Sequence, residues 1–159
     1  MPRRSAGILL HRRVGGGELE VLLVHPGGPF WAKKDVGAWS IPKGEHGDDE
    51  DALAAALREF EEELGTPPSP DAEPQSLGEV RQKGGKLVTA WALAGDLDPE
   101  LIVSNTFEME WPPRSGRTQA FPEVDRAGWF TLAQAREKLL PAQLPLLERL
   151  AELPAAQGG

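Results

Sequence analysis

The sequence predicts an α/β fold in which a mixed β-sheet packs against one central helix and two C-terminal helices. Apolar-rich segments of strand length lie before and after the central helix. Between residues 48 and 64, apolar side chains recur every three or four positions, which is the period of an amphipathic helix. The chain has 159 residues, a length that suits one domain with its own core. We therefore expect a single domain over residues 1–159, with a frayed tail at 154–159.

The chain begins with a predicted β-hairpin. Segments 6–12 and 18–25 are rich in Leu, Val and Ile, and three glycines at 15–17 provide the turn between them. Residues 26–45 are rich in Pro and Gly, so we expect a long loop with a short strand around residues 39–41. A loop of this length inside a compact domain is usually functional.

The central helix is predicted over residues 48–64. Four acids at 48–51 provide an N-cap and complement the positive N-terminal end of the helix. Gly65 follows the last apolar residue and is expected to end the helix. The predicted core-facing stripe consists of Leu53, Ala56, Leu57, Phe60 and Leu64.

The second half of the chain supplies further strands and the last two helices. After a Pro-rich linker, residues 75–96 are predicted to form two strands that turn at Gly84-Gly85. Residues 98–105 favour neither helix nor strand. Residues 107–128 are predicted to form a second long loop, followed by a short strand at 128–131. Helices are expected at 132–140 and 144–150.

Charge and composition exclude several classes of function. The 25 acidic residues against 17 Lys and Arg give a net charge of −8, which disfavours binding to nucleic-acid polymers and anionic membranes. The absence of cysteine removes disulfides, thiolate zinc sites and cysteine nucleophiles. No apolar run has the length of a signal peptide core or a transmembrane helix. We expect a cytoplasmic protein, either a monomer or a homodimer.

The end of the central helix carries an unfavourable run of carboxylates. Acids near a helix C-terminus oppose its partial negative charge, at a cost of up to about 1 kcal/mol each. Glutamate is also a good helix former, so an exposed acidic face is one explanation. However, Glu59, Glu62 and Glu63 are spaced i, i+3 and i+4, which places them on one face. Oxygen ligands in this arrangement suit a hard divalent cation such as Mg²⁺.

The spacing of residues before this helix matches a known motif. Five residues separate Gly44 from Glu50, and seven more precede Arg58, where the sequence continues "REFEEELG". This arrangement resembles the Nudix box, with every fixed letter present from Gly44 to Gly65. The single departure is Thr66, where the motif has an aliphatic residue. The resemblance implies a Nudix-type helix–sheet–helix sandwich and a metal-dependent hydrolase that cleaves a diphosphate linkage in a nucleotide substrate.

The resemblance also implies roles for individual residues. Arg58 would orient the glutamates, Glu50 would support them, and Glu62 would be the central catalytic acid. A base or further metal ligand from outside the box would be Glu123, with Glu108 and Glu110 as alternatives. The implied ligands of Mg²⁺ or Mn²⁺ are Glu59, Glu62, Glu63 and the carbonyl group of Gly44.

Substrate contacts are expected from the segment before the box and from the second loop. "WSIPKGE" is similar to a segment of Nudix enzymes that act on dinucleoside polyphosphates, on oxidised nucleoside triphosphates or on diphosphoinositol polyphosphates. Lys43 and Trp39 belong to it, and Arg114 and Arg117 are further candidates for polyphosphate contacts. Aromatic side chains for base stacking are Phe30, Trp31, Trp39, Phe107, Trp111 and Phe121. The histidines His11, His25 and His46 lack metal-site spacing and are expected to be structural or exposed.

The predicted function is metal-dependent hydrolysis of a nucleoside polyphosphate, with a dinucleoside polyphosphate favoured. Clearance of oxidised nucleoside triphosphates and hydrolysis of ADP-ribose-type nucleotide sugars are the alternatives within the enzyme class. A non-catalytic nucleotide sensor is the alternative from another class, and the retained glutamates at 59, 62 and 63 argue against it. The expected partner is a small nucleotide, with no nucleic-acid polymer and no membrane.

Overall fold

The structure is a computed structural model that describes residues 3–68 and 72–153. The predicted frayed tail therefore lies outside the described residues. The strands are β1 (Arg4–Arg13), β2 (Leu19–Pro26), β3 (Lys43–Glu45), β4 (Gln75–Arg81), β5 (Leu87–Ala94), β6 (Thr106–Glu110), β7 (Thr118–Pro122) and β8 (Val124–Thr131). The helices are α1 (Ala52–Leu64), α2 (Leu132–Lys138) and α3 (Leu144–Glu152), with 3₁₀ turns η1 (Lys83–Gly85), η2 (Pro99–Leu101) and η3 (Pro141–Gln143). No helix in these ranges is long and apolar enough to cross a membrane.

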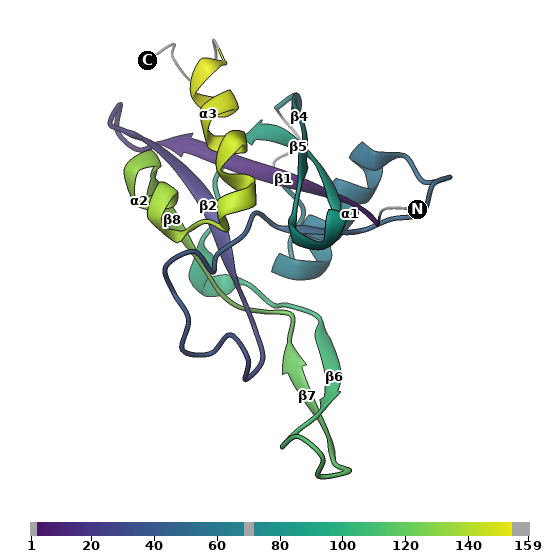
Figure 1. Cartoon of the computed structure of the whole chain (residues 1–159). Helices are drawn as coiled ribbons and strands as arrows, with labels where there is room; N and C mark the ends of the chain where they lie inside the picture. The colour runs from purple at the N-terminus through teal and green to yellow at the C-terminus, as the bar shows by residue number, and fades with distance from the viewer. Residues whose placement is uncertain (1–2, 69–71, 154–159) are drawn as a thin grey trace.

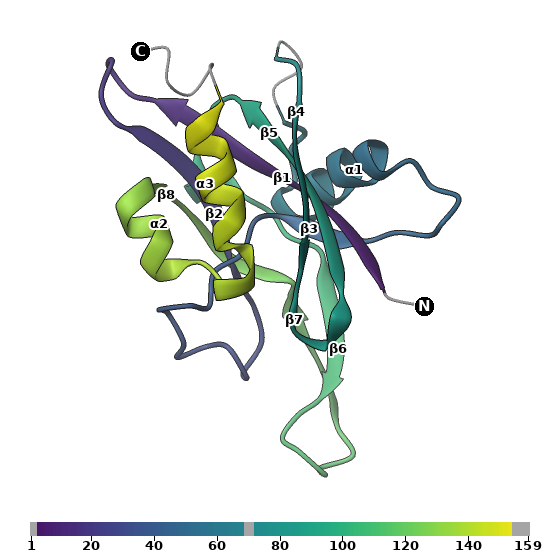
Figure 2. The same cartoon turned by 45° about the horizontal axis from the view of Figure 1, so that its top comes forward.

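A six-stranded mixed sheet forms the centre of the molecule. Its strand order is β4-β5-β1-β2-β8, with β3 pairing with part of β1. The pair β1–β5 is parallel, whereas the other pairs in this sheet are antiparallel. Helix α1 covers one face, and α2 and α3 cover the other (Figures 1 and 2). The predicted mixed sheet and helix–sheet–helix sandwich are confirmed.

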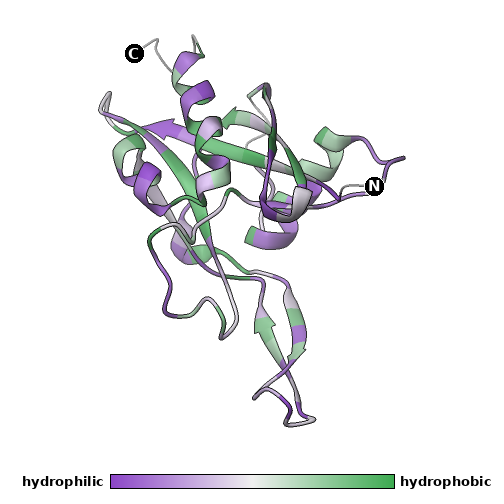
Figure 3. Ribbon diagram, in the orientation of Figure 1, coloured by the Kyte–Doolittle hydropathy of each residue, from purple (hydrophilic) through white to green (hydrophobic). Residues whose placement is uncertain are grey.

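The sheet is buried on both faces, so the middle of each central strand is a continuous apolar run, Ala6–Leu10 in β1 and Val21–Val24 in β2. Ile8 and Leu10 of β1 pack on the α1 side, while Leu9 packs on the side of α2 and α3. Strand β2 alternates in the same way. Figure 3 shows the hydrophobic colouring of β2. A strand covered on both sides shows a continuous apolar run in place of the polar–apolar alternation of a half-exposed strand.

One edge of β1 is divided between two partners. Strand β2 pairs with β1 at His11–Arg13, whereas β3 pairs with β1 at Ser5–Gly7. Between these contacts, the Ile8 amide donates to the carbonyl oxygen of Pro42 at 3.1 Å. Strand β2 diverges from β1 and exchanges hydrogen bonds with Ser40 instead. Because β2 diverges from β1, the segment Ser40–Lys43, which precedes the Nudix-box motif, can enter the sheet.

Helix α1 begins later than the sequence suggested. Asp51 is its N-cap, and the Asp51 carboxylate accepts a hydrogen bond from the Ala54 amide at 2.9 Å. The acids at 48–50 therefore form the preceding turn. Gly65 ends the helix at φ 77°, a left-handed conformation that glycine adopts without strain. The predicted stripe holds, because Ala56, Phe60 and Leu64 are buried, while Leu53 and Leu57 pack partly against the same cluster.

The prediction of a second long loop was wrong. Residues 106–122 form an antiparallel hairpin, β6–β7, that extends from the body of the molecule (Figure 1). Strand β8 also begins at Val124 instead of residue 128. The apolar residues Phe107 and Met109 alternate with exposed acids, which is a strand pattern. Pro112, Pro113 and Gly116 lie in the connection between the two strands, and Pro122 is the last residue of β7, so none of them interrupts the pairing.

The stability of the fold is expected to depend on pH through His11. His11 lies on β1 and is 7% exposed. Burial, with a smaller effect of the Arg13 charge, lowers the pKa of its imidazole from 6.5. The unfolded chain therefore binds a proton more readily than the folded chain. The stability that the neutral, buried imidazole contributes is lost as pH falls below 6.5.

Urea unfolding at several pH values tests this expectation. Relative to His11→Gln, wild-type protein should lose free energy of unfolding between about pH 7.5 and 5.5, with a slope of at most about 1.4 kcal/mol per pH unit. Parallel pH curves for the two proteins would show that His11 contributes no such dependence.

Candidate active site

The acidic face of α1 lies against strand β3. The backbone amide of Lys43 donates a hydrogen bond to Glu63 Oε2 at 2.8 Å. A Cβ atom on Gly44 would lie 2.0 Å from Glu59 Cδ, so a side chain there would occupy the place of the Glu59 carboxylate. Both contacts join the helix to the strand that precedes it. Gly44 is therefore required here because α1 approaches β3 closely.

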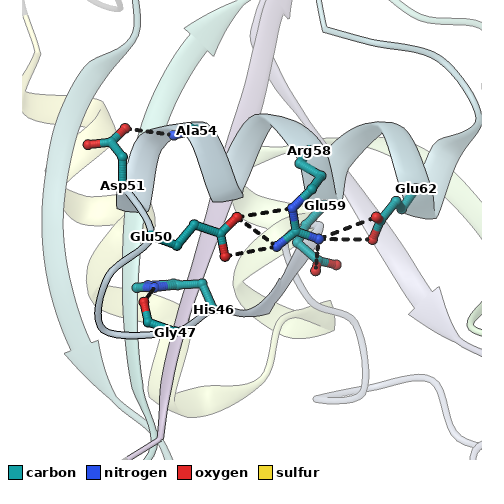
Figure 4. A network of polar contacts seen from close by, with 8 residues as sticks. All are labelled: His46, Gly47, Glu50, Asp51, Ala54, Arg58, Glu59 and Glu62. Atoms are coloured by element: carbon teal, nitrogen blue, oxygen red, sulfur yellow. Dashed lines mark hydrogen bonds and ion pairs between the residues drawn. The ribbon is translucent and has the colours of Figure 1, made fainter.

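Arg58 connects three glutamates of the box (Figure 4). Its Nη1 atom lies 2.9 Å from Glu59 Oε1 and 3.3 Å from both carboxylate oxygens of Glu62. Its Nε and Nη2 atoms donate to the two oxygens of Glu50 at 3.1 and 3.2 Å. The guanidinium group offsets the repulsion among these acids and holds their side chains in place. The orienting role of Arg58 and the supporting role of Glu50 stay predictions, and these contacts place both side chains beside the glutamates concerned.

Glu123 is the predicted loop acid that the structure brings to the box. It lies between β7 and β8, where the Gly27 amide donates to its carbonyl oxygen at 3.0 Å. Burial and the charge of Glu62 raise the pKa of Glu123. Glu108 and Glu110 instead lie on exposed positions of β6, and Glu110 accepts a hydrogen bond from the Arg114 amide at 2.9 Å.

Burial and mutual repulsion disfavour full ionisation of the acid cluster. Burial raises the pKa of Glu63 to about 8, with Lys43 opposing the shift and Glu59 and Glu123 adding to it. Burial followed by the charge of Glu62 raises the pKa of Glu59. Since each carboxylate is favoured by a nearby positive charge, the cluster is electrostatically suited to a cation.

The donor chemistry of this cluster fits a divalent metal. Four carboxylates, those of Glu59, Glu62, Glu63 and Glu123, influence one another electrostatically, and oxygen is the donor atom that Mg²⁺ and Mn²⁺ prefer. In residues 3–68 and 72–153, no three acidic or histidine side chains form a ready-made cation cage. The carboxylates of Glu59 and Glu62 contact Arg58 instead.

A pocket of about 260 Å³ adjoins Glu63 and Glu123, near the place where β2 diverges from β1. Lys43, Glu63 and Glu123 lie on its wall, together with apolar side chains and two uncharged polar ones. The complete lining is Val24, Pro26, Trp31, Ala38, Ser40, Ile41, Lys43, Glu63, Gln82, Glu123, Val124 and Leu140. We call this cavity the acidic pocket. Sequence reasoning missed Gln82, because the turn that carries it has no motif.

A second pocket, of about 390 Å³, lies between the first long loop and strand β6. Its lining is Pro26, Gly27, Gly28, Phe30, Trp31, Phe107, Met109 and Glu123. It shares Pro26, Trp31 and Glu123 with the acidic pocket, so the two cavities adjoin. The rings of Phe30 and Trp31 meet edge to face, with their centroids 5.3 Å apart. We call this cavity the aromatic pocket.

Three predicted substrate residues lie away from these pockets. Trp39 is 5% exposed, and its Nε1 atom donates to Asp35 at 2.8 Å. Its ring packs against Phe130 in the core, which gives it a structural position. Arg114 and Arg117 are exposed in the connection at the end of the β6–β7 hairpin.

The histidine side chains are placed as structural or surface groups. His25 is fully buried and links β8 to the first long loop, because its Nδ1 and Nε2 atoms contact Asp125 and the Lys34 carbonyl oxygen. His46 contacts the carbonyl oxygen of Gly47 in the turn before α1. His11 is buried on β1.

Comparisons with known proteins agree with this fold and site. The model of the NUDIX domain matches residues 1–150. Among solved structures, a binary complex of a C. elegans Ap4A hydrolase has a TM-score of 0.64 and 21% identity, covering 92% of this chain and 95% of that one. The M. smegmatis Nudix hydrolase RenU has a TM-score of 0.58 and 26% identity, with coverages of 95% and 84%.

A third structure is the NUDIX domain of Shewanella oneidensis NrtR complexed with ADP ribose. It has a TM-score of 0.57 and 20% identity, with coverages of 96% and 88%. Comparison with curated protein sequences gave no significant match. The fold, the acidic helix and the matched domain together define a Nudix pyrophosphohydrolase, a class that generally uses divalent metal ions. This chain belongs to the NUDIX family.

The contact between Gly44 and Glu59 can be tested by substitution. Gly44→Ala would place a methyl group where the Glu59 carboxylate lies, so that side chain must move. Because displacement of a reacting group by about 1 Å can lower rates about 100-fold, we expect a loss of this size in turnover of a nucleotide substrate.

Gly47→Ala is the matched control for this substitution. The nearest atom to its added Cβ is the flexible Asp49 side chain at 3.0 Å, so activity should stay near wild type. Equal activity of Gly44→Ala and wild type would show that Glu59 need not occupy this position.

Proposed function

We propose that this protein hydrolyses a diphosphate linkage in nucleoside polyphosphates, with dinucleoside polyphosphates as the favoured substrates and Mg²⁺ or Mn²⁺ as the cofactor. The observation that supports this most is the junction of the two pockets. Glu123 lines both of them, Glu63 and Lys43 line one, and aromatic rings line the other. A substrate with a base and a phosphate chain would place these two parts in adjoining cavities.

The proposed metal ligands are Glu59, Glu62, Glu63 and the carbonyl group of Gly44. When bound, a divalent cation neutralises phosphate charge and lowers the pKa of water, which favours attack on phosphorus. Arg58 holds the carboxylates of Glu59 and Glu62 in the orientation that they need. Glu123, whose pKa is raised by burial, is the group proposed to accept the proton of the attacking water.

The remaining substrate contacts follow from the pocket linings. Lys43 offers an ammonium group to a phosphate, and the rings of Phe30, Trp31 and Phe107 offer apolar faces to a base. Arg114 and Arg117 remain proposed contacts for the distal part of a long substrate. Trp39 supports the pocket wall from the core, since Ala38 and Ser40 on either side of it line the acidic pocket.

A substrate panel tests this function. Purified protein with Mg²⁺ or Mn²⁺ would be offered diadenosine tetraphosphate, 8-oxo-dGTP and ADP-ribose, with products identified by mass in ¹⁸O water. We expect the highest kcat/KM with diadenosine tetraphosphate. A preference for 8-oxo-dGTP or ADP-ribose would select one of the two alternatives. Binding without turnover of any compound would overturn the proposal in favour of a nucleotide sensor.

Glu62→Gln should separate catalysis from folding. The substitution removes one negative charge from the proposed metal site, so we expect kcat to fall by about 10²- to 10⁴-fold. Stability should be kept or improved, because the charge lies at the negative end of α1. Glu61→Gln is the matched control, since Glu61 is the exposed neighbouring acid. Full activity of Glu62→Gln would contradict its assigned role.

Metal binding should change the pH dependence of stability. Because the pKa of Glu63 is raised to about 8, the metal-free folded state holds a proton that the unfolded chain releases above about pH 4.5. The stability that Glu63 contributes should therefore fall as pH rises from about 4.5 to 8, a range that includes pH 6.5. Above that range, the pKa of Lys43, which burial lowers to about 8, acts in the opposite direction.

Thermal unfolding with and without Mg²⁺ measures this effect. Mg²⁺ at one fixed concentration, about 100 times its Kd at pH 8, should add about 2.7 kcal/mol to the free energy of unfolding at pH 8. The gain in melting temperature should be larger at pH 8 than at pH 6.5, and Glu63→Gln should reduce that difference. An equal gain at both pH values would argue against a metal at these carboxylates.

A further inference from the structure

The C-terminal end of α1 is hydrogen-bonded to the three residues from Val103 to Asn105, which we call the bridging segment. The Val103 amide donates to the Leu64 carbonyl oxygen at 3.0 Å. The Asn105 amide donates to the Glu62 carbonyl oxygen at 3.1 Å. A helix leaves its last carbonyl groups without partners inside the helix, and the bridging segment supplies donors for two of them. Gly65 permits this approach, because a Cβ atom there would lie 2.7 Å from the Val103 carbonyl oxygen.

The bridging segment also holds the backbone of Glu123. The Glu123 amide donates to the Asn105 carbonyl oxygen at 2.8 Å, and the Val124 amide donates to Ser104 Oγ at 3.0 Å. The Ser104 hydroxyl group in turn donates to the Asn105 carbonyl oxygen at 2.8 Å. The Gly27 amide donates to the Glu123 carbonyl oxygen at 3.0 Å. Both backbone polar groups of Glu123 are therefore hydrogen-bonded.

These contacts set the position of Glu123 relative to α1. Asn105 donates its amide to Glu62 and accepts from the amide of Glu123, so a single residue joins the two backbones. Burial, followed by the charge of Glu62, raises the pKa of Glu123, as expected for carboxylates within electrostatic reach. The β6–β7 hairpin begins at this junction, because its first pair is Thr106 with Pro122. Glu123 is thus held at the base of the hairpin, close to α1.

Ser104 provides the side-chain contact between the bridging segment and the start of β8. It is half-buried, and its hydroxyl group accepts from the Val124 amide. Val124 is 4% exposed, so water does not readily replace this acceptor. Leaving a buried amide without a partner costs more than the hydrogen bond itself contributes. Without the hydroxyl group, the chain at 123–124 would shift, and the Glu123 side chain that lines both pockets would shift with it.

We propose that Ser104 is the positioning residue of Glu123, and that its hydroxyl group fixes the start of β8 so that the Glu123 carboxylate faces the substrate from a constant place. Ser104 itself does not touch the substrate. The role of Glu123 as the proton acceptor rests on the proposed function. The contact between Ser104 and the chain at 123–124 rests on the fold alone.

A double-mutant cycle with diadenosine tetraphosphate tests the positioning role. Ser104→Ala should lower kcat about tenfold with KM nearly unchanged, because a small displacement of a reacting group slows the chemical step. In the Glu123→Gln background, the same substitution should change kcat by less than about twofold, because the group that it positions is already lost. A tenfold fall in both backgrounds, or no fall in either, would overturn the proposal.

Two further variants separate positioning from a general loss of stability. Ser104→Thr keeps the hydroxyl group, so kcat should return close to the wild-type value. Ser76→Ala is the matched control, since Ser76 Oγ accepts from the Gly78 amide at 3.2 Å on β4, at the edge of the sheet. It should leave kcat and KM unchanged. A folded Ser104→Thr with the kcat of Ser104→Ala, or an equal effect of Ser76→Ala, would contradict the positioning role.

Amide hydrogen exchange distinguishes failure of this inference from failure of the proposed function. In metal-free protein, Ser104→Ala should speed exchange of the Glu123 and Val124 amides at least about tenfold. The Val103 amide, which is bonded to Leu64, should exchange as in wild type. Unchanged exchange at Glu123 and Val124 would overturn the inference whatever the activity. If wild-type protein hydrolyses no compound of the panel, the proposed function fails, and exchange still decides whether Ser104 holds Glu123.

Discussion

The divided edge of β1 is the constraint on which the rest of the site depends. If β2 paired with β1 along its whole length, β3 would have no place in the sheet and the acidic pocket would be filled. Because β2 pairs only at His11–Arg13, β3 enters at Ser5–Gly7. Strand β3 then brings the Lys43 amide and the Cα atom of Gly44 against the acidic face of α1. Topology thus creates both the cavity and its charged wall.

The electrostatics of α1 show how the molecule maintains a site that opposes its own folding. The acids at the C-terminal end of the helix repel one another and the helix dipole. Arg58 offsets part of this repulsion through contacts to Glu50, Glu59 and Glu62. Burial, together with the charge of neighbouring acids, raises the pKa of Glu63 and of Glu123. Burial of the two apolar clusters, one on each face of the sheet, offsets the destabilising repulsion among these acids.

The parts of the site that sequence reasoning located are those fixed by local spacing. Glu59, Glu62 and Glu63 lie on one side of α1 because a helix places i, i+3 and i+4 on one face, and Arg58 reaches Glu62 for the same reason. Glu123 comes from a distant junction between strands, so only the resemblance to the family suggested it.

The parts that could not be predicted depend on contacts between distant segments. The buried amide of Gln143 joins residues 40–41 to Gln82, and no local pattern marks this contact. The β6–β7 hairpin was mistaken for a loop because Pro and Gly in its connection outweighed the alternation in its strands.

The β6–β7 hairpin lines the aromatic pocket from outside the six-stranded sheet. It belongs to a two-stranded sheet of its own, apart from the six-stranded sheet on which α1 and its glutamates pack. Yet Phe107 and Met109 of β6 form part of the aromatic pocket, and Phe107 lies next to Gly28. Substitutions in the hairpin can therefore reshape the contact with the base while the strand pairing around α1 stays intact. Under the proposed function, the hairpin would therefore influence which base is bound, while α1 keeps the carboxylates of the hydrolytic centre.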